Sequence, residues 1–142
     1  MPDLEAQASK YFKWKELLYL SHWDRYASAS DGLNDEIIEN LVTIATRVDA
    51  VRDFLMVPLY VTSGYRPPAY SKLVGGFETD VHTMGLAIDC TPQGIGCEDA
   101  RMMIESKLDQ FQIRMENNGP NGNWLHFDAY GPLPGHKRFF LP

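Results

Sequence analysis

Two histidines and one aspartate in the second half of the chain form a pattern that could hold a metal ion. They are His82 and Asp89, in the segment HTMGLAID, and His126, in the segment WLHFD. A catalytic zinc ion needs three protein ligands of the nitrogen or oxygen type and a fourth position that stays open for water. Spacing alone leaves open that these are ordinary core or surface side chains, because the interval H-x6-D has no geometry of its own.

The elements expected around these residues would direct them to one point. His82 ends a loop rich in turn-forming residues, whereas Asp89 lies in the strand-like run LAIDCT. His126 lies in the middle of an alternating run, residues 124–130, that is typical of another strand. Alternation along this run puts Asp128 on the same face as His126. Two His and one carboxylate from separate elements could therefore converge on one ion.

The remaining chain predicts an α+β fold, with helices first and antiparallel strands later. Residues 34–53 predict the longest helix, because Asn34 is a suitable N-cap and an apolar stripe follows it. The other expected elements are a short helix in YFKWKELLYL capped by Ser9, a loop in SHWDRYASASDG, a strand in LYVTS, a helix over 98–108, a strand over 111–115 that forms a hairpin with 124–130, and an irregular tail GPLPGHKRFFLP. No internal repeat or low-complexity linker divides the chain, so we expect a single domain over residues 1–142.

Composition disfavours several classes of function. The chain has 13 Lys+Arg against 19 Asp+Glu, a net charge of −6, and its basic residues are scattered. Without a basic stripe or an anion-binding surface we expect no nucleic-acid partner and no membrane partner. The longest apolar run is too short to span a bilayer and the N-terminus lacks a signal-peptide pattern, so we expect a cytoplasmic protein as synthesised. We also expect a monomer. Cys90 and Cys97 form no CxxC pair, and we expect two free thiols.

Four segments together resemble peptidase family M15, the zinc D-Ala-D-Ala carboxypeptidases, and more closely its small phage-type peptidoglycan peptidases. They are SGYR, VGG, HTMGLAID and WLHFD, in that order. The resemblance covers roughly residues 10–132 and implies a hedgehog/DD-peptidase fold, an antiparallel sheet with flanking helices. It also implies a Zn²⁺ ion held by His82, Asp89 and His126. The implied reaction is hydrolysis of a peptide bond in bacterial cell-wall stem peptides, by a phage-encoded or virion-associated protein.

Two positions depart from the family's pattern. Asp80 stands where relatives commonly have a serine that helps to hold a substrate carboxylate. A negative charge there would repel a terminal carboxylate and favour an ammonium group. Asn123 stands where many relatives carry the general base, and an amide cannot take up a proton. Asn123 therefore leaves open an inactive, zinc-stabilised domain that binds the wall or builds a virion.

Glu116 is the expected replacement for the missing base. It ends the strand expected to pair with the His126 strand, and some relatives place the base in this way. Asp128 is the competing candidate, although a carboxylate on that face can instead orient a metal-binding histidine.

Arg66 and Ser63 belong to the SGYR segment, directly after the LYVTS run. The resemblance implies that Arg66 faces the substrate cleft, where its guanidinium would bind a substrate carboxylate or the developing oxyanion, with Ser63 assisting. A surface ion pair is the alternative role for Arg66. Neither the bond that is cut nor the choice between endopeptidase and carboxypeptidase follows from the sequence.

Overall fold

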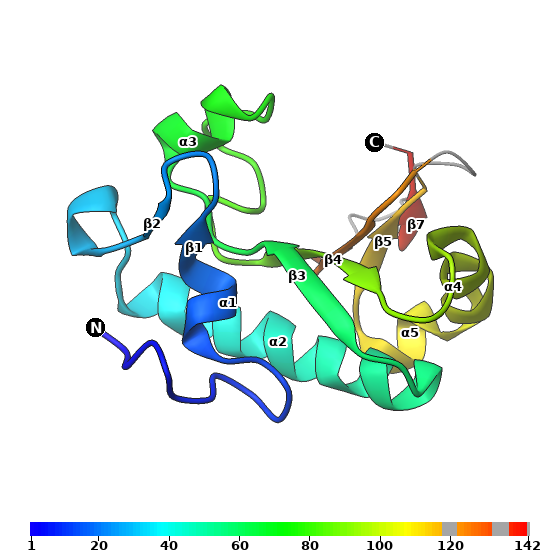
Figure 1. The fold of residues 1–142 in the computed structure, drawn as a ribbon. Coiled ribbons are helices and arrows are strands. Elements are labelled where there is room, and N and C mark those ends of the chain that lie inside the picture. The colour runs from blue at the N-terminus through cyan, green and yellow to red at the C-terminus, as the bar shows by residue number, and fades with distance from the viewer. Residues whose placement is uncertain (118–121, 132–136, 142) are drawn as a thin grey trace.

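A five-stranded sheet forms the centre of the computed structural model, which describes residues 1–117, 122–131 and 137–141 (Figure 1). In spatial order the strands are β3 (Leu59–Ser63), β4 (Ala87–Pro92), β6 (Leu125–Asp128), β5 (Arg114–Glu116) and β7 (Phe139–Phe140). All neighbours are antiparallel except β5 and β7, which are parallel. With its flanking helices, this sheet confirms the predicted α+β class.

Helices flank the sheet (Figure 1). They are α1 (Trp14–Leu18), α2 (Asp35–Leu55), α3 (Pro68–Leu73), α4 (Cys97–Ile104) and α5 (Leu108–Phe111), with short 3-10 turns at Ala29–Asp31 and Glu105–Lys107. The predicted helix over 34–53 is confirmed as α2 and runs on to Leu55. Its cap forms as expected, because the Asn34 side chain accepts a hydrogen bond from the backbone N–H of Ile37 at 2.9 Å. In the described residues, no helix is both long enough and apolar enough to cross a membrane.

The two faces of the sheet have different roles. Ile88 and Cys90 of β4, with Leu125 and Phe127 of β6, are fully buried in the hydrophobic core, which also contains the apolar stripe of α2. Because side chains alternate along a strand, Asp89, His126 and Asp128 lie on the opposite face. The helix and core therefore hold one face of the sheet rigid, and that rigidity positions the polar residues on the other. Cys90 and Cys97 are free thiols, as predicted.

Three local predictions near the N-terminus and α5 are wrong. Ser9 caps no helix, because its hydroxyl donates to the buried carboxylate of Asp49 at 2.9 Å and α1 begins only at Trp14. The segment predicted as a loop contains β2 (Arg25–Tyr26), which pairs with β1 (Tyr19–Leu20) at the end of the segment predicted as a helix. The strand predicted from Phe111 begins only at Arg114, because Phe111 still belongs to α5 and Gln112 adopts a left-handed backbone with φ 57°.

The C-terminal tail also differs from its prediction, since it contains a strand. β7 pairs with β5 through bonds such as that from the Met115 N–H to the Arg138 carbonyl, at 2.7 Å. The predicted hairpin pairing of β5 with β6 is confirmed. Its connecting loop lies partly outside the described residues, as do positions 132–136 of the tail.

Candidate metal centre

A row of residues, polar except for Phe140 at its end, crosses the sheet at the level of Asp89. The pairings observed along this row are Ser63 with Asp89, Asp89 with His126, and Glu116 with Phe140. On β5 and β6, Met115 lies opposite Phe127, so the same register sets Glu116 opposite His126 one residue further on. Each of the five strands therefore contributes one residue to the row.

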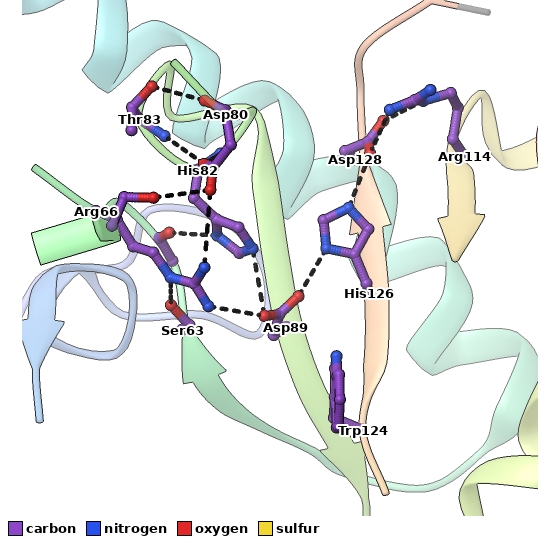
Figure 2. Close-up of polar contacts among 12 residues, drawn as sticks. Ser63, Arg66, Asp80, His82, Thr83, Asp89, Arg114, Trp124, His126 and Asp128 are labelled. Atoms are coloured by element: carbon purple, nitrogen blue, oxygen red, sulfur yellow. Dashed lines mark hydrogen bonds and ion pairs between the residues drawn. The ribbon is translucent and has the colours of Figure 1, made fainter. Parts of the chain in front are cut away.

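His82, Asp89 and His126 converge as the sequence predicts (Figure 2). His82 Nε2 lies 3.3 Å from one Asp89 carboxylate oxygen, and His126 Nδ1 lies 2.8 Å from the other. All three side chains are buried, and their ligand atoms lie within 4.8 Å of one another. Within the described ranges they form the one group of three or more His, Cys, Asp and Glu residues that could hold a metal ion.

Each histidine has one ring nitrogen bonded to a partner outside the metal group and turns the other toward Asp89. The nitrogens that face Asp89 are His82 Nε2 and His126 Nδ1. His82 Nδ1 lies 2.8 Å from the Gly64 carbonyl oxygen, and His126 Nε2 lies 2.8 Å from Asp128 Oδ2. Metal-binding histidines typically donate their second N–H to a carbonyl or carboxylate in this way. Two ligand atoms on a tetrahedral zinc ion lie about 3.3 Å apart. The His82–Asp89 separation equals this value, and the His126–Asp89 separation of 2.8 Å is shorter by about half an ångström. The donor set therefore fits zinc.

Charge is strongly coupled within this group. Burial by itself would raise the pKa of Asp89, but the adjacent imidazoles of His82 and His126 outweigh it and hold that pKa well below its ordinary value. Burial opposes protonation of His126, yet hydrogen bonds to Asp128 and Asp89 outweigh it and raise the pKa of His126 to about 10. The carboxylates thus create a strongly cation-favouring pocket.

Asp128 is fully buried and both of its oxygens are engaged. Arg114 donates Nε to one oxygen at 2.7 Å and a terminal nitrogen to the other at 2.9 Å, and the Tyr130 N–H adds a contact at 3.2 Å. Arg114 was missed by the sequence reasoning. The signal for it was available, because a hairpin pairing residues near 114 with residues near 128 puts this arginine beside Asp128.

Glu116 is half-buried at the edge of the same site. It lies two residues beyond Arg114 and therefore on the same face of β5, since the intervening Met115 is fully buried in the core. Among the described residues, no hydrogen-bond or ion-pair partner holds its carboxylate. Partial burial raises the pKa of Glu116, an effect that the nearby charge of His126 opposes in part.

Arg66 reaches into the site from the end of β3. Its Nε donates to Ser63 Oγ at 2.8 Å, and a terminal nitrogen lies 3.2 Å from an Asp89 oxygen (Figure 2). The side chain is largely covered, with 17% of its surface exposed, so it is no surface ion pair. Arg66 and Ser63 therefore lie beside the metal group, but neither is among the residues that line the cleft described below. The substrate role of Arg66 stays a prediction.

Asp80 organises the loop that carries His82. One carboxylate oxygen accepts from the backbone N–H groups of His82 at 2.8 Å and Thr83 at 3.3 Å. The other accepts from the Ser71 hydroxyl at 2.8 Å and lies 4.0 Å from Arg66. Asp80 therefore has a structural role in addition to any contact with substrate. Gly85 packs the same loop closely against α2, where a Cβ atom would lie 2.7 Å from the Ile37 carbonyl oxygen.

A cleft of about 410 Å³ opens beside the metal group. Its polar lining residues are Thr79, Asp80, Arg114, Glu116, His126 and Asp128, and its apolar ones are Phe77, Val81, Met84, Tyr130 and Phe140. Asn123, at the position where many relatives carry the base, is exposed and lies outside this lining. A substrate in the cleft would contact both carboxylates and apolar side chains.

The sequence has been compared with known proteins and families. No curated protein and no solved structure matches it. Residues 10–128 match the family described as Peptidase M15, and this range includes every residue of the His82, Asp89 and His126 group. The chain therefore belongs to peptidase family M15.

Proposed function

We propose that this protein is a zinc-dependent peptidase that hydrolyses a peptide bond in the stem peptides of bacterial peptidoglycan. The observation that carries the proposal is the convergence of His82, Asp89 and His126. His82 Nε2 and His126 Nδ1 both face the Asp89 carboxylate, while the other ring nitrogen of each histidine is bonded elsewhere. Membership in peptidase family M15 supports the class of reaction. The cleft beside the group offers room for a peptide.

Zinc would be held by His82 Nε2, His126 Nδ1 and the Asp89 carboxylate. A bound zinc ion supplies a Lewis acid that polarises the scissile carbonyl and makes the attacking water more acidic. The buried, carboxylate-rich surroundings of these atoms favour a cation. Arg66 beside Asp89 limits the excess of negative charge in the pocket.

Glu116 is the proposed general base. It takes a proton from the attacking water and returns it to the leaving amine. Its uncommitted carboxylate, its place opposite His126 and its raised pKa support this role. The four contacts that occupy Asp128 support the alternative assigned to that residue, which is to orient His126.

Arg66 and Ser63 are proposed to hold the substrate. The Arg66 guanidinium lies beside the metal group, where its remaining N–H groups can bind a carbonyl oxygen or a carboxylate of the peptide. Asp80 lies next to Arg66 at the cleft and disfavours a free carboxylate at that point, so an ammonium-bearing or internal segment of the stem peptide fits better. We propose that the protein acts on the wall as a monomer, without nucleic acid or membrane as a partner, and that it is phage-encoded or virion-associated.

Digestion of purified peptidoglycan, followed by mass spectrometry of the soluble products, tests the proposal. The zinc-loaded protein should release fragments with new amino and carboxyl termini, chelator should stop the release, and zinc should restore it. His126→Ala should release nothing, whereas His22→Ala, a change at an exposed histidine outside the site, should match the parent. Zinc-loaded parent protein that binds the wall and releases no fragment would instead identify an inactive wall-binding domain, the alternative that Asn123 favours.

A further inference from the structure

Arg114 makes contacts that an ordinary surface arginine does not make. Its guanidinium donates two hydrogen bonds to Asp128, at 2.7 and 2.9 Å, and stacks 4.3 Å from the centre of the Phe140 ring. The Tyr130 ring lies 5.2 Å from the same guanidinium. Only 17% of the Arg114 side chain is exposed. Two hydrogen bonds to one carboxylate and stacking on an aromatic ring together fix the orientation of a planar guanidinium.

This orientation passes to the proposed metal ligand. Asp128 Oδ2 accepts from Arg114 and also lies 2.8 Å from His126 Nε2, so one oxygen links the guanidinium to the imidazole. Asp128 is fully buried, and a buried carboxylate without a paired cation is costly. Arg114 thus supplies both the charge that lets Asp128 stay buried and the geometry that turns it to His126.

We propose that Arg114 is a positioning residue of the metal centre, holding His126 Nδ1 toward Asp89 through Asp128; this inference rests on the zinc site of the proposed function. The C-terminal strand β7 contributes to this positioning of His126. Phe140 of β7 covers the guanidinium of Arg114, and its ring meets the His126 ring edge-on at 6.0 Å. The family match ends at residue 128, so the contacts of Phe140 with Arg114 and His126 come from outside the matched region.

Zinc affinity, measured by competition with a chromogenic chelator, tests the proposal without any need for hydrolysis. Arg114→Met should weaken zinc binding about 10-fold or more, in the range seen when partners of metal-binding histidines are changed. Arg114→Lys should fall between this variant and the parent, because lysine keeps the charge but loses the two-pronged donor. The visible spectrum of the Co²⁺-substituted protein should shift in both variants, since the His126 ligand changes its orientation.

The chain offers a matched control in Arg25. It also donates two hydrogen bonds to one carboxylate, Asp31, at 2.7 and 2.8 Å, but touches none of the three proposed ligands. Arg25→Met should therefore bind zinc as the parent does. A double variant separates action through Asp128 from a general loss of order. In an Asp128→Asn background, Arg114→Met should cost little further affinity, because the two residues act as one unit.

Two results would overturn the inference while the zinc site stands. One is a folded Arg114→Met protein with parental zinc affinity and an unchanged Co²⁺ spectrum. The other is a full additive loss in the Asp128→Asn background. If circular dichroism shows that Arg114→Met is unfolded, Arg114→Lys and Phe140→Leu carry the same comparison, and parental affinity in both would be equally decisive. A parent protein that binds no zinc would overturn this inference together with the proposed function.

Discussion

The two histidines of the centre are held by partners of different kinds. His82 donates to a backbone carbonyl, that of Gly64, whereas His126 depends on the side chain of Asp128. A backbone partner moves only when the chain moves, but a carboxylate can be removed by a single substitution. Substitutions can therefore change the hydrogen bond that orients His126 more readily than the one that orients His82. Substitutions near His126 can also distinguish the proposed roles of Asp128 and Glu116.

Glu116→Gln preserves the shape of the side chain and removes its ability to take up a proton. Loss of one positioned acid–base group typically lowers the rate about 10²–10⁴-fold. We expect turnover of muropeptides to fall by this order while zinc affinity stays close to that of the parent. Kinetics and metal analysis of the same preparation check both halves of the prediction.

Asp128→Asn is the contrasting variant, because Asp128 is expected to act on the metal ligand. It should weaken zinc binding about 10–100-fold, and excess zinc should restore part of the activity. The assignment of roles would be reversed by an active Glu116→Gln protein alongside an Asp128→Asn protein that is inactive with zinc fully bound.

Arg66→Lys retains the positive charge beside Asp89 but loses the fork that reaches Ser63 and Asp89 together. We expect kcat/KM on muropeptides to fall about 10-fold or more while zinc remains bound, since the fork is expected to hold the substrate or oxyanion. Steady-state kinetics with metal-loaded protein measure this. Cleavage by Arg66→Ala at the parental rate would show that Arg66 does not hold the substrate.

At the scale of elements, the features that could be predicted are those encoded locally. The cap at Asn34 and the stripe of α2 follow from neighbouring residues, and the alternation of β6 places His126 and Asp128 on one face. The features that were missed depend on distant partners. Ser9 is drawn away from a capping role by Asp49, 40 positions along the chain, and β7 exists because β5 offers it an edge. Arg114 is a different case, because the predicted hairpin of β5 with β6 already implied that it lies beside Asp128.

Gly64 joins α1, β3 and the metal centre at one position. A Cβ atom there would lie 2.4 Å from the Leu17 carbonyl oxygen, and the Gly64 carbonyl itself accepts from His82. Gly64→Ala should destabilise the protein by about 1–3 kcal/mol through overpacking, and should weaken zinc binding because the carbonyl is displaced. Thermal unfolding and chelator competition measure the two effects.

Gly131→Ala is the control for this substitution, because a Cβ at Gly131 would meet nothing within 4 Å. It should leave the melting temperature and the zinc affinity at parental values. Equal effects from the two substitutions would disprove the role assigned to Gly64.

The hairpin β1–β2 is joined to the following turn by Arg25 and Asp31. Hydrogen bonds from Arg25 outweigh the opposing effect of burial and lower the pKa of Asp31 to about 2, from an ordinary value of 3.8. A depressed pKa in the folded state gives stability that is present above pH 3.8 and is lost as the pH falls through about 2. Asp31→Asn should therefore lower the melting temperature by a few degrees at pH 6, and the difference should vanish near pH 2. A pH-independent difference would contradict this account.

At the scale of the whole molecule, the centre is assembled from segments that lie far apart in the chain. Arg66 follows β3, His82 lies in the turn that precedes β4, and Glu116 and His126 lie on separate strands of the sheet. No one of these segments can hold a metal ion by itself, so the fold must form before the donor atoms meet. The proposed zinc binding would consequently be a property of the native state, and zinc should stabilise that state by mass action.

The most direct test of this account is the zinc content of purified protein, measured per chain by plasma mass spectrometry. The parent and His22→Ala should each carry one zinc ion, and the double variant His82→Ala/His126→Ala should carry none. X-ray absorption on the parent should give zinc–nitrogen distances of about 2.0–2.1 Å with an oxygen at a similar distance. Stoichiometric zinc in a folded His82→Ala/His126→Ala protein would contradict the assignment of the metal centre.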